Sequence, residues 1–136
     1  MDLEEDGKLS RRGARKAKIT IPGLPPSLWG AYGRVRNGSK KFLSPKAREW
    51  KSEAVSVIKE QFKRRPLEGR VEVVIKFLVK TRGRWDLDNR EKLLIDSLTE
   101  ANVWLDDQQI DFLSVSVHVD GSIKDPVTVV EVGAHE

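Results

Sequence analysis

The residues best suited to chemistry are two pairs of aspartates in the second half of the chain. Asp86 and Asp88 are separated by one residue and lie between an alternating segment and a helical one. In extended chain, side chains two apart point the same way, and carboxylates a few ångströms apart repel by about 4 kcal/mol at an effective dielectric of about 20. A divalent cation converts that repulsion into attraction, and hard oxygen ligands suit Mg²⁺, with Mn²⁺ as a substitute. The pair is therefore a candidate metal site.

A purely structural interpretation of the same pair is also open. Asp88 and Glu91 have the spacing of a capping box at a helix start, which explains Asp88 and leaves Asp86 unexplained. Lys92 lies one helical turn after Asp88 on the same face. It could hold a carboxylate, meet a phosphate oxygen, or form an ordinary surface pair.

The second acidic pair is Asp106 and Asp107, directly after Trp104 and Leu105. A helix of about fourteen residues separates the two pairs by roughly 20 Å along its axis. The two pairs therefore meet only if tertiary folding brings the chain back. Asp106 and Asp107 could otherwise be ordinary turn residues.

Hydrophobic periodicity predicts the elements that must position these acids. Ile19 to Ile21 form a short strand that ends at Pro22, and Ser44 followed by Pro45 begins a helix. This helix continues to about 64. It is followed by a strand over 70–80, a helix ending near 102, and strands over 113–119 and 127–132. This βαβαββ order predicts an α+β fold, a small mixed sheet with two helices, as one domain over 18–133.

Positive charge is concentrated in one part of the chain. The overall net charge is +4, but residues 7–92 hold 24 Lys and Arg against 8 Asp and Glu. Such an excess favours a polyanionic partner, because phosphate binding releases counterions; a solvated basic face is the alternative. Residues 1–17 have too few apolar groups to pack, and we predict a basic disordered arm there, either a DNA tether or a solvating tail.

Basic residues near the acids and in the earlier glycine-punctuated loop are candidates for DNA backbone contacts. They are Arg82, Arg84 and Arg90, with Arg34, Arg36, Lys40 and Lys41 from the loop. Trp29, in the same loop, is as consistent with a core position as with base stacking.

Cysteine is absent, which excludes disulfides, thiolate catalysis and the usual zinc sites. No apolar run approaches the roughly 18 residues that a membrane helix needs. We therefore expect a cytoplasmic protein with no membrane association.

Two motifs together resemble a known family. The signature of RusA-type Holliday junction resolvases is similar to Arg84 to Asn89, then Lys92, Asp96, Leu98 and Thr99, then Trp104 to Asp107. Ile19 to Pro22 and Pro25 to Ser27 resemble the opening strand and proline turn of that family. The resemblance extends over about 18–133. Two positions depart from the family pattern. Leu28 and Trp29 stand where asparagines are often found, and Trp85 stands where many relatives carry a basic residue.

The resemblance implies a Mg²⁺-dependent endonuclease that acts as a homodimer and makes paired symmetric nicks in four-way DNA junctions. It implies a metal-binding catalytic cluster of Asp86, Asp88 and Asp107, with Asp106 beside it and Lys92 assisting. Two other functions stay open. One is a DNA-binding module without catalysis, and the other is a metal nuclease for flaps or other branched nucleic acids.

Overall fold

The computed structural model of the chain describes residues 16–26, 32–34, 41–83 and 87–135, and only the backbone of 32–34, 41–43 and 87–89. The elements in chain order are β2 (Ala17–Pro22), β3 (Tyr32–Arg34), β4 (Lys41–Leu43), α2 (Pro45–Gln61), β5 (Val71–Val79), α3 (Leu87–Glu100), η3 (Asp107–Gln109), β6 (Ile110–Val119) and β7 (Val127–Ala134). The fold is α+β, as predicted, with a four-stranded mixed sheet and two helices.

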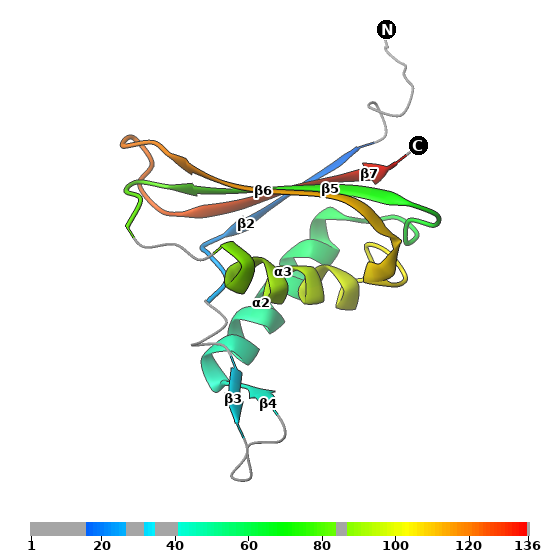
Figure 1. The fold of residues 1–136 in the computed structure, drawn as a ribbon, viewed down its shortest axis with the longest axis horizontal. Helices are drawn as coiled ribbons and strands as arrows, with labels where there is room; N and C mark the ends of the chain where they lie inside the picture. The colour runs from blue at the N-terminus through cyan, green and yellow to red at the C-terminus, as the bar shows by residue number, and fades with distance from the viewer. Residues whose placement is uncertain (1–15, 27–31, 35–40, 84–86, 136) are drawn as a thin grey trace, which may run out of the picture.

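The sheet has the strand order β2-β7-β5-β6 (Figure 1). β5 and β6 are parallel, whereas β7 is antiparallel to both β5 and β2. A parallel pair needs a long crossover connection, and α3 supplies it. Because of this crossover, the chain enters β6 beside the start of β5, where Ile110 pairs with Val71.

The core lies between one face of the sheet and the two helices, which both lie on that side of the sheet (Figure 1). The odd-numbered residues of β5 from Val71 to Val79 are buried, and the residues between them are half-buried. Burying an aliphatic or aromatic side chain of this kind contributes roughly 1.5–3 kcal/mol. β5 therefore contributes one face to the core cluster in which both helices also pack.

The first helix begins as predicted. The Ser44 hydroxyl accepts a hydrogen bond from the Ala47 N–H (3.2 Å), and Pro45 occupies the first helical turn. α2 ends at Gln61, a few residues before the predicted end, and the side chain of Phe62 at its C-cap is buried. Within the described ranges, no helix combines the length and apolarity that crossing a membrane requires.

One prediction of local structure was wrong. The segment interpreted as a glycine-punctuated loop contains two short antiparallel strands, β3 and β4, in which Arg34 pairs with Lys41. This hairpin lies at the N-terminal end of α2, away from the four-stranded sheet (Figure 1). Residues 27–31 and 35–40 of the predicted loop, and residues 1–15 of the predicted arm, lie outside the described residues.

Both ends of the described chain are tied to the central strand. On the face of the sheet opposite the helices, the Glu72 carboxylate pairs with Lys16 Nζ (3.0 Å) and with His135 Nδ1 (3.1 Å). These contacts, His135 first and then Lys16, hold the pKa of Glu72 below its usual value. Ala17, the last residue of the predicted 1–17 arm, is therefore already part of β2, where it pairs with Val132.

We expect Glu72→Gln to lower stability at neutral pH, by no more than about 1 kcal/mol because both partners are partly exposed. Since the folded-state pKa of Glu72 is depressed, its contribution is present above the ordinary value of 4.5 and is lost as the pH falls through the folded-state value. Thermal melts from neutral to acidic pH should thus show the variant and the parent converging. Glu131→Gln, on the adjacent strand, is the matched control and should show no such pH-dependent difference.

Candidate functional site

The end of α3 directs the chain into the second acidic motif. Asn102 adopts a left-handed conformation (φ 64°) just past the helix. The Asn102 N–H donates to the Thr99 carbonyl (3.0 Å), and the Val103 N–H donates to the Leu98 carbonyl (3.1 Å). These two bonds form a Schellman motif, which satisfies the last helical carbonyls and reverses the chain.

Trp104 anchors the motif in the core. Its side chain is fully buried, and its indole N–H donates to the Thr99 hydroxyl (2.7 Å). Residues 103 and 104 also run beside Leu67, whose N–H donates to the Val103 carbonyl (2.8 Å). The tryptophan therefore determines where the following acidic turn, residues 105–109, begins.

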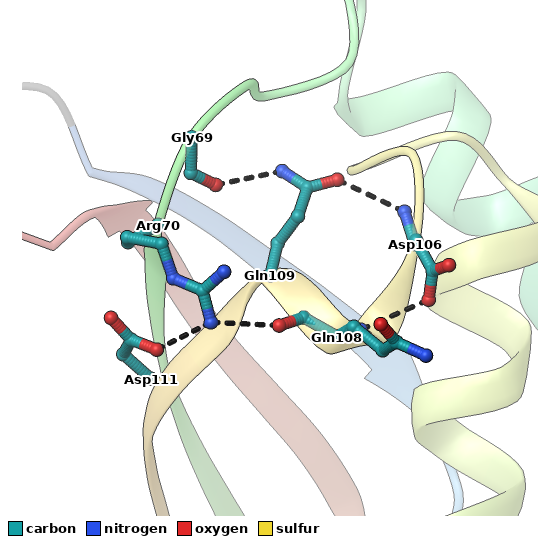
Figure 2. A network of polar contacts seen from close by, with 6 residues as sticks. All are labelled: Gly69, Arg70, Asp106, Gln108, Gln109 and Asp111. Atoms are coloured by element: carbon teal, nitrogen blue, oxygen red, sulfur yellow. Dashed lines mark hydrogen bonds and ion pairs between the residues drawn. The ribbon is translucent and has the colours of Figure 1, made fainter.

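The two aspartates of this turn have different local roles. Asp106 is the N-cap of the short helix η3, and its carboxylate accepts a hydrogen bond from the Gln108 N–H (3.0 Å) (Figure 2). The turn interpretation is thus correct for Asp106. Asp107 is the first residue of η3 and has an exposed side chain.

Asp107 lies within electrostatic reach of the middle of α3. Partial desolvation raises its pKa above the ordinary value, the Asp106 carboxyl and then Asp96 raise it further, and Lys92 opposes the shift. Asp96 and Lys92 are one helical turn apart in α3. Tertiary folding therefore brings the second acidic motif back to the helix that follows the first one.

The structure corrects the local geometry assumed for Asp86 and Asp88. The pair was taken to lie in an extended segment, but α3 begins at Leu87, so Asp88 is already in the first helical turn. Its position inside the helix also contradicts the capping box in which Asp88 is the cap residue. Asp86 lies outside the described residues, as does the side chain of Asp88.

The described acids have the chemistry that a divalent cation needs. Asp107, Asp106 and Asp96 supply only carboxylate oxygens, and after desolvation the two neighbouring acids are what raises the pKa of Asp107. A bound cation would relieve that repulsion. Among the residues with described side chains, no group of three metal-ligating residues lies close enough to hold an ion; two of the four predicted ligands, Asp86 and Asp88, are not among them.

The predicted DNA-contacting residues occupy different environments. Arg82 is exposed in the loop after β5, whereas Arg90 is half-buried and its guanidinium donates to the Pro25 carbonyl (2.8 Å). Arg34 and Lys41 are cross-strand partners in the hairpin. Arg36, Lys40 and Arg84 lie outside the described residues.

Two residues near the acids were given no role from the sequence. Asp96 acts on Asp107, and the regular spacing of Asp88, Lys92 and Asp96 along one helix face is the signal that could have identified it. Gln109 hydrogen-bonds the backbone of the turn. The spacing of Asp106 and Gln109 is that of a capping box, which the structure contains and which could have identified the local bonds. No spacing rule points to the bonds from Gln109 to Leu67 and Gly69, which lie about 40 residues away in the sequence.

We expect Asp107→Asn to stabilise the metal-free protein at neutral pH, by less than about 1 kcal/mol because the site is exposed. The folded-state pKa of Asp107 is raised, so its ionised form destabilises the fold above that value. This penalty disappears as the pH falls below the ordinary value of 3.8. Thermal melts in chelator over this pH range measure the effect. Asp125→Asn, in the β6–β7 turn, is the control that should change nothing, and an equal gain there would contradict the assignment.

Comparisons with known proteins identify the family of the chain. The family model described as Endodeoxyribonuclease RusA matches residues 22–132. The proteins named crossover junction endodeoxyribonuclease RusA from Shigella sonnei strain Ss046, Escherichia coli strain K12 and Enterobacteria phage 82 are each 32% identical over 116 residues, which is 85% of this chain and 94% of the relative. Because the match extends over most of this chain and nearly all of each relative, the chain belongs to the RusA endodeoxyribonuclease family.

Proposed function

We propose that this chain is a divalent-metal-dependent endonuclease that resolves four-way DNA junctions; its relatives are named crossover junction endodeoxyribonucleases. The observation that carries the proposal is the approach of Asp107 to Lys92 and Asp96 of α3. This approach supports the proposal that the second acidic motif and the helix carrying Asp88 belong to one site. Bringing these carboxylates together costs electrostatic repulsion, and a turn without a catalytic role would give no reason for it.

Asp86, Asp88 and Asp107, with Asp106 beside them, are the residues that we propose to hold Mg²⁺, or Mn²⁺ in its place. The cation supplies charge neutralisation at the scissile phosphate and lowers the pKa of an attacking water. Asp106 already accepts a hydrogen bond from the Gln108 N–H, so we assign it a supporting role. Lys92 is exposed on α3 and lowers the pKa of Asp107, and we assign it both to orient that carboxylate and to meet a phosphate oxygen.

DNA affinity would come from cations around the acidic region. Arg82 is exposed beside the α3 start, and the hairpin offers Arg34 and Lys41 as cross-strand neighbours. Together with Arg84, Arg36 and Lys40 they would contact backbone phosphates, which recognises the shape of a junction more than its bases. Arg90 would contribute less, because one of its terminal nitrogens already binds Pro25.

We also propose that the enzyme is a homodimer. Paired nicks in opposing strands need two active sites related by a two-fold axis. The exposed edge strand β6 supports the idea, because Leu113 (40% exposed) and Val119 (53% exposed) leave apolar surface on it. Branched DNA in the cytoplasm is the partner that we assign, and the absence of cysteine fits that reducing compartment.

We expect Asp86→Asn and Asp107→Asn each to reduce cleavage of a synthetic four-way junction by at least about 100-fold while preserving junction binding. Each change removes charge needed by the cation and leaves the basic surface intact. Cleavage is measured on denaturing gels and binding by gel shift in chelator. Asp125→Asn is the control that should cut normally, and full cleavage by either site variant would refute its assignment.

The choice of substrate separates the alternative functions. A junction, a flap and a linear duplex are incubated with Mg²⁺ and with chelator. Resolution of the junction alone, and only with Mg²⁺, is the expected result. Binding without cutting under every condition would favour a DNA-binding module, and preferential cutting of the flap would favour a nuclease for other branched substrates.

For the dimer, we expect light scattering to give about twice the chain mass of 15.4 kDa. Mixed dimers of the parent chain with Asp107→Asn should then nick one strand of a junction and leave the opposing strand uncut, because only one site is active. Paired cuts by isolated mixed dimers, or a monomeric mass with full activity, would contradict the two-site arrangement.

A further inference from the structure

The side chain of Gln109 connects the acidic turn to the loop before β5. Its Oε1 accepts hydrogen bonds from the N–H groups of Leu105 (2.8 Å) and Asp106 (2.9 Å). Its Nε2 donates to the carbonyls of Leu67 (2.9 Å) and Gly69 (2.8 Å). A carboxamide has two acceptor positions and two donors, and all of them are used here.

A second side chain, Arg70, supports the same turn from the same loop. Its guanidinium donates to the Gln108 carbonyl (2.7 Å) and forms an ion pair with Asp111 (2.5 Å). Figure 2 shows Gln109 between Gly69 and Asp106, and Arg70 between Asp111 and Gln108. The turn is thus held on both sides of Asp107, through residues that contribute no carboxylate to the site.

The exposure of the acids explains why this support matters. Asp106 and Asp107 both have exposed side chains, so packing does not hold them, and two neighbouring carboxylates repel each other. Without backbone support the turn would relax and separate the carboxylates. Ligand groups held in position before the cation arrives lose less freedom on binding it, and outer hydrogen-bond partners typically change metal affinity by about 10–100-fold.

We propose that Gln109 is a positioning residue for the metal site: its carboxamide fixes the Asp106–Asp107 turn to the loop before β5, so that the carboxylates are in place before a cation binds. This inference rests on the proposed function, since it assumes that Asp107 is a metal ligand. Gln109 touches neither substrate nor the reacting atoms, and it acts through the backbone of the turn.

The test compares Gln109→Ala with two matched controls. Gln61→Ala removes a similar carboxamide, which binds the Thr20 N–H (2.8 Å) and carbonyl (2.8 Å) and ties α2 to β2. Gln108→Ala removes the neighbouring glutamine, whose backbone rather than side chain makes the described hydrogen bonds. The first control matches the loss of stability, and the second matches the location.

Two measurements are made on the DNA-free protein. Calorimetric titration with Mn²⁺ should show affinity at least about 10-fold weaker for Gln109→Ala and within about 2-fold of the parent for both controls. Amide hydrogen exchange in chelator should show lost protection at Leu105 and Asp106 in Gln109→Ala alone. If the alanine variant does not fold, Gln109→Met, which keeps the length and removes the four hydrogen bonds, takes its place with the same expected results.

The outcomes separate this inference from the proposed function. If the parent and Asp107→Asn bind Mn²⁺ equally well or not at all, the proposed metal site is wrong. If the parent binds Mn²⁺ through Asp107 but the Gln109 variants bind it equally well, only the positioning role is wrong. Equal weakening in Gln61→Ala would likewise overturn it, because the effect would then follow from stability alone.

Discussion

Carboxylates that lie close together repel one another, and the acidic turn of this chain holds Asp106 and Asp107 near Asp96 in spite of that repulsion. Partial desolvation raises the pKa of Asp107, and the neighbouring carboxyls of Asp106 and Asp96 raise it further. If only the stability of the fold determined their positions, these exposed carboxylates would move apart. Their approach therefore has to be maintained by contacts elsewhere, and most of the local structure around the turn can be understood as those contacts.

Each of these contacts acts on the backbone rather than on the carboxylates. The left-handed Asn102 reverses the chain after α3, buried Trp104 fixes where the turn starts, and the Gln109 carboxamide joins the turn to the loop before β5. Single hydrogen bonds contribute only about 0.5–1.5 kcal/mol net. The Gln109 side chain makes four hydrogen bonds to two separate segments, so it restricts the turn much more than a single hydrogen bond would.

Sheet topology is what makes such contacts available. Because β5 and β6 are parallel, α3 must carry the chain back across the sheet, and the residues just before β6 arrive beside those just before β5. Arg70 and Gln109, 39 positions apart in the sequence, thereby support the same turn. The first acidic motif lies at the opposite end of this connection, where β5 has ended and α3 begins. One crossover unit therefore contains both motifs, and the family match over residues 22–132 includes both of them.

The sequence by itself determined the elements with strong periodicity or end signals: the βαβαββ order, the buried face of β5, and the start of α2 at Ser44. These follow from interactions within a few residues. It did not reveal the β3–β4 hairpin, whose strands of three residues are too short for a periodic signal, or the helical position of Asp88. Only the tertiary structure decided that Asp107 meets α3 and that Gln109 holds its turn, because those contacts join segments whose separation is set by strand pairing and not by sequence spacing.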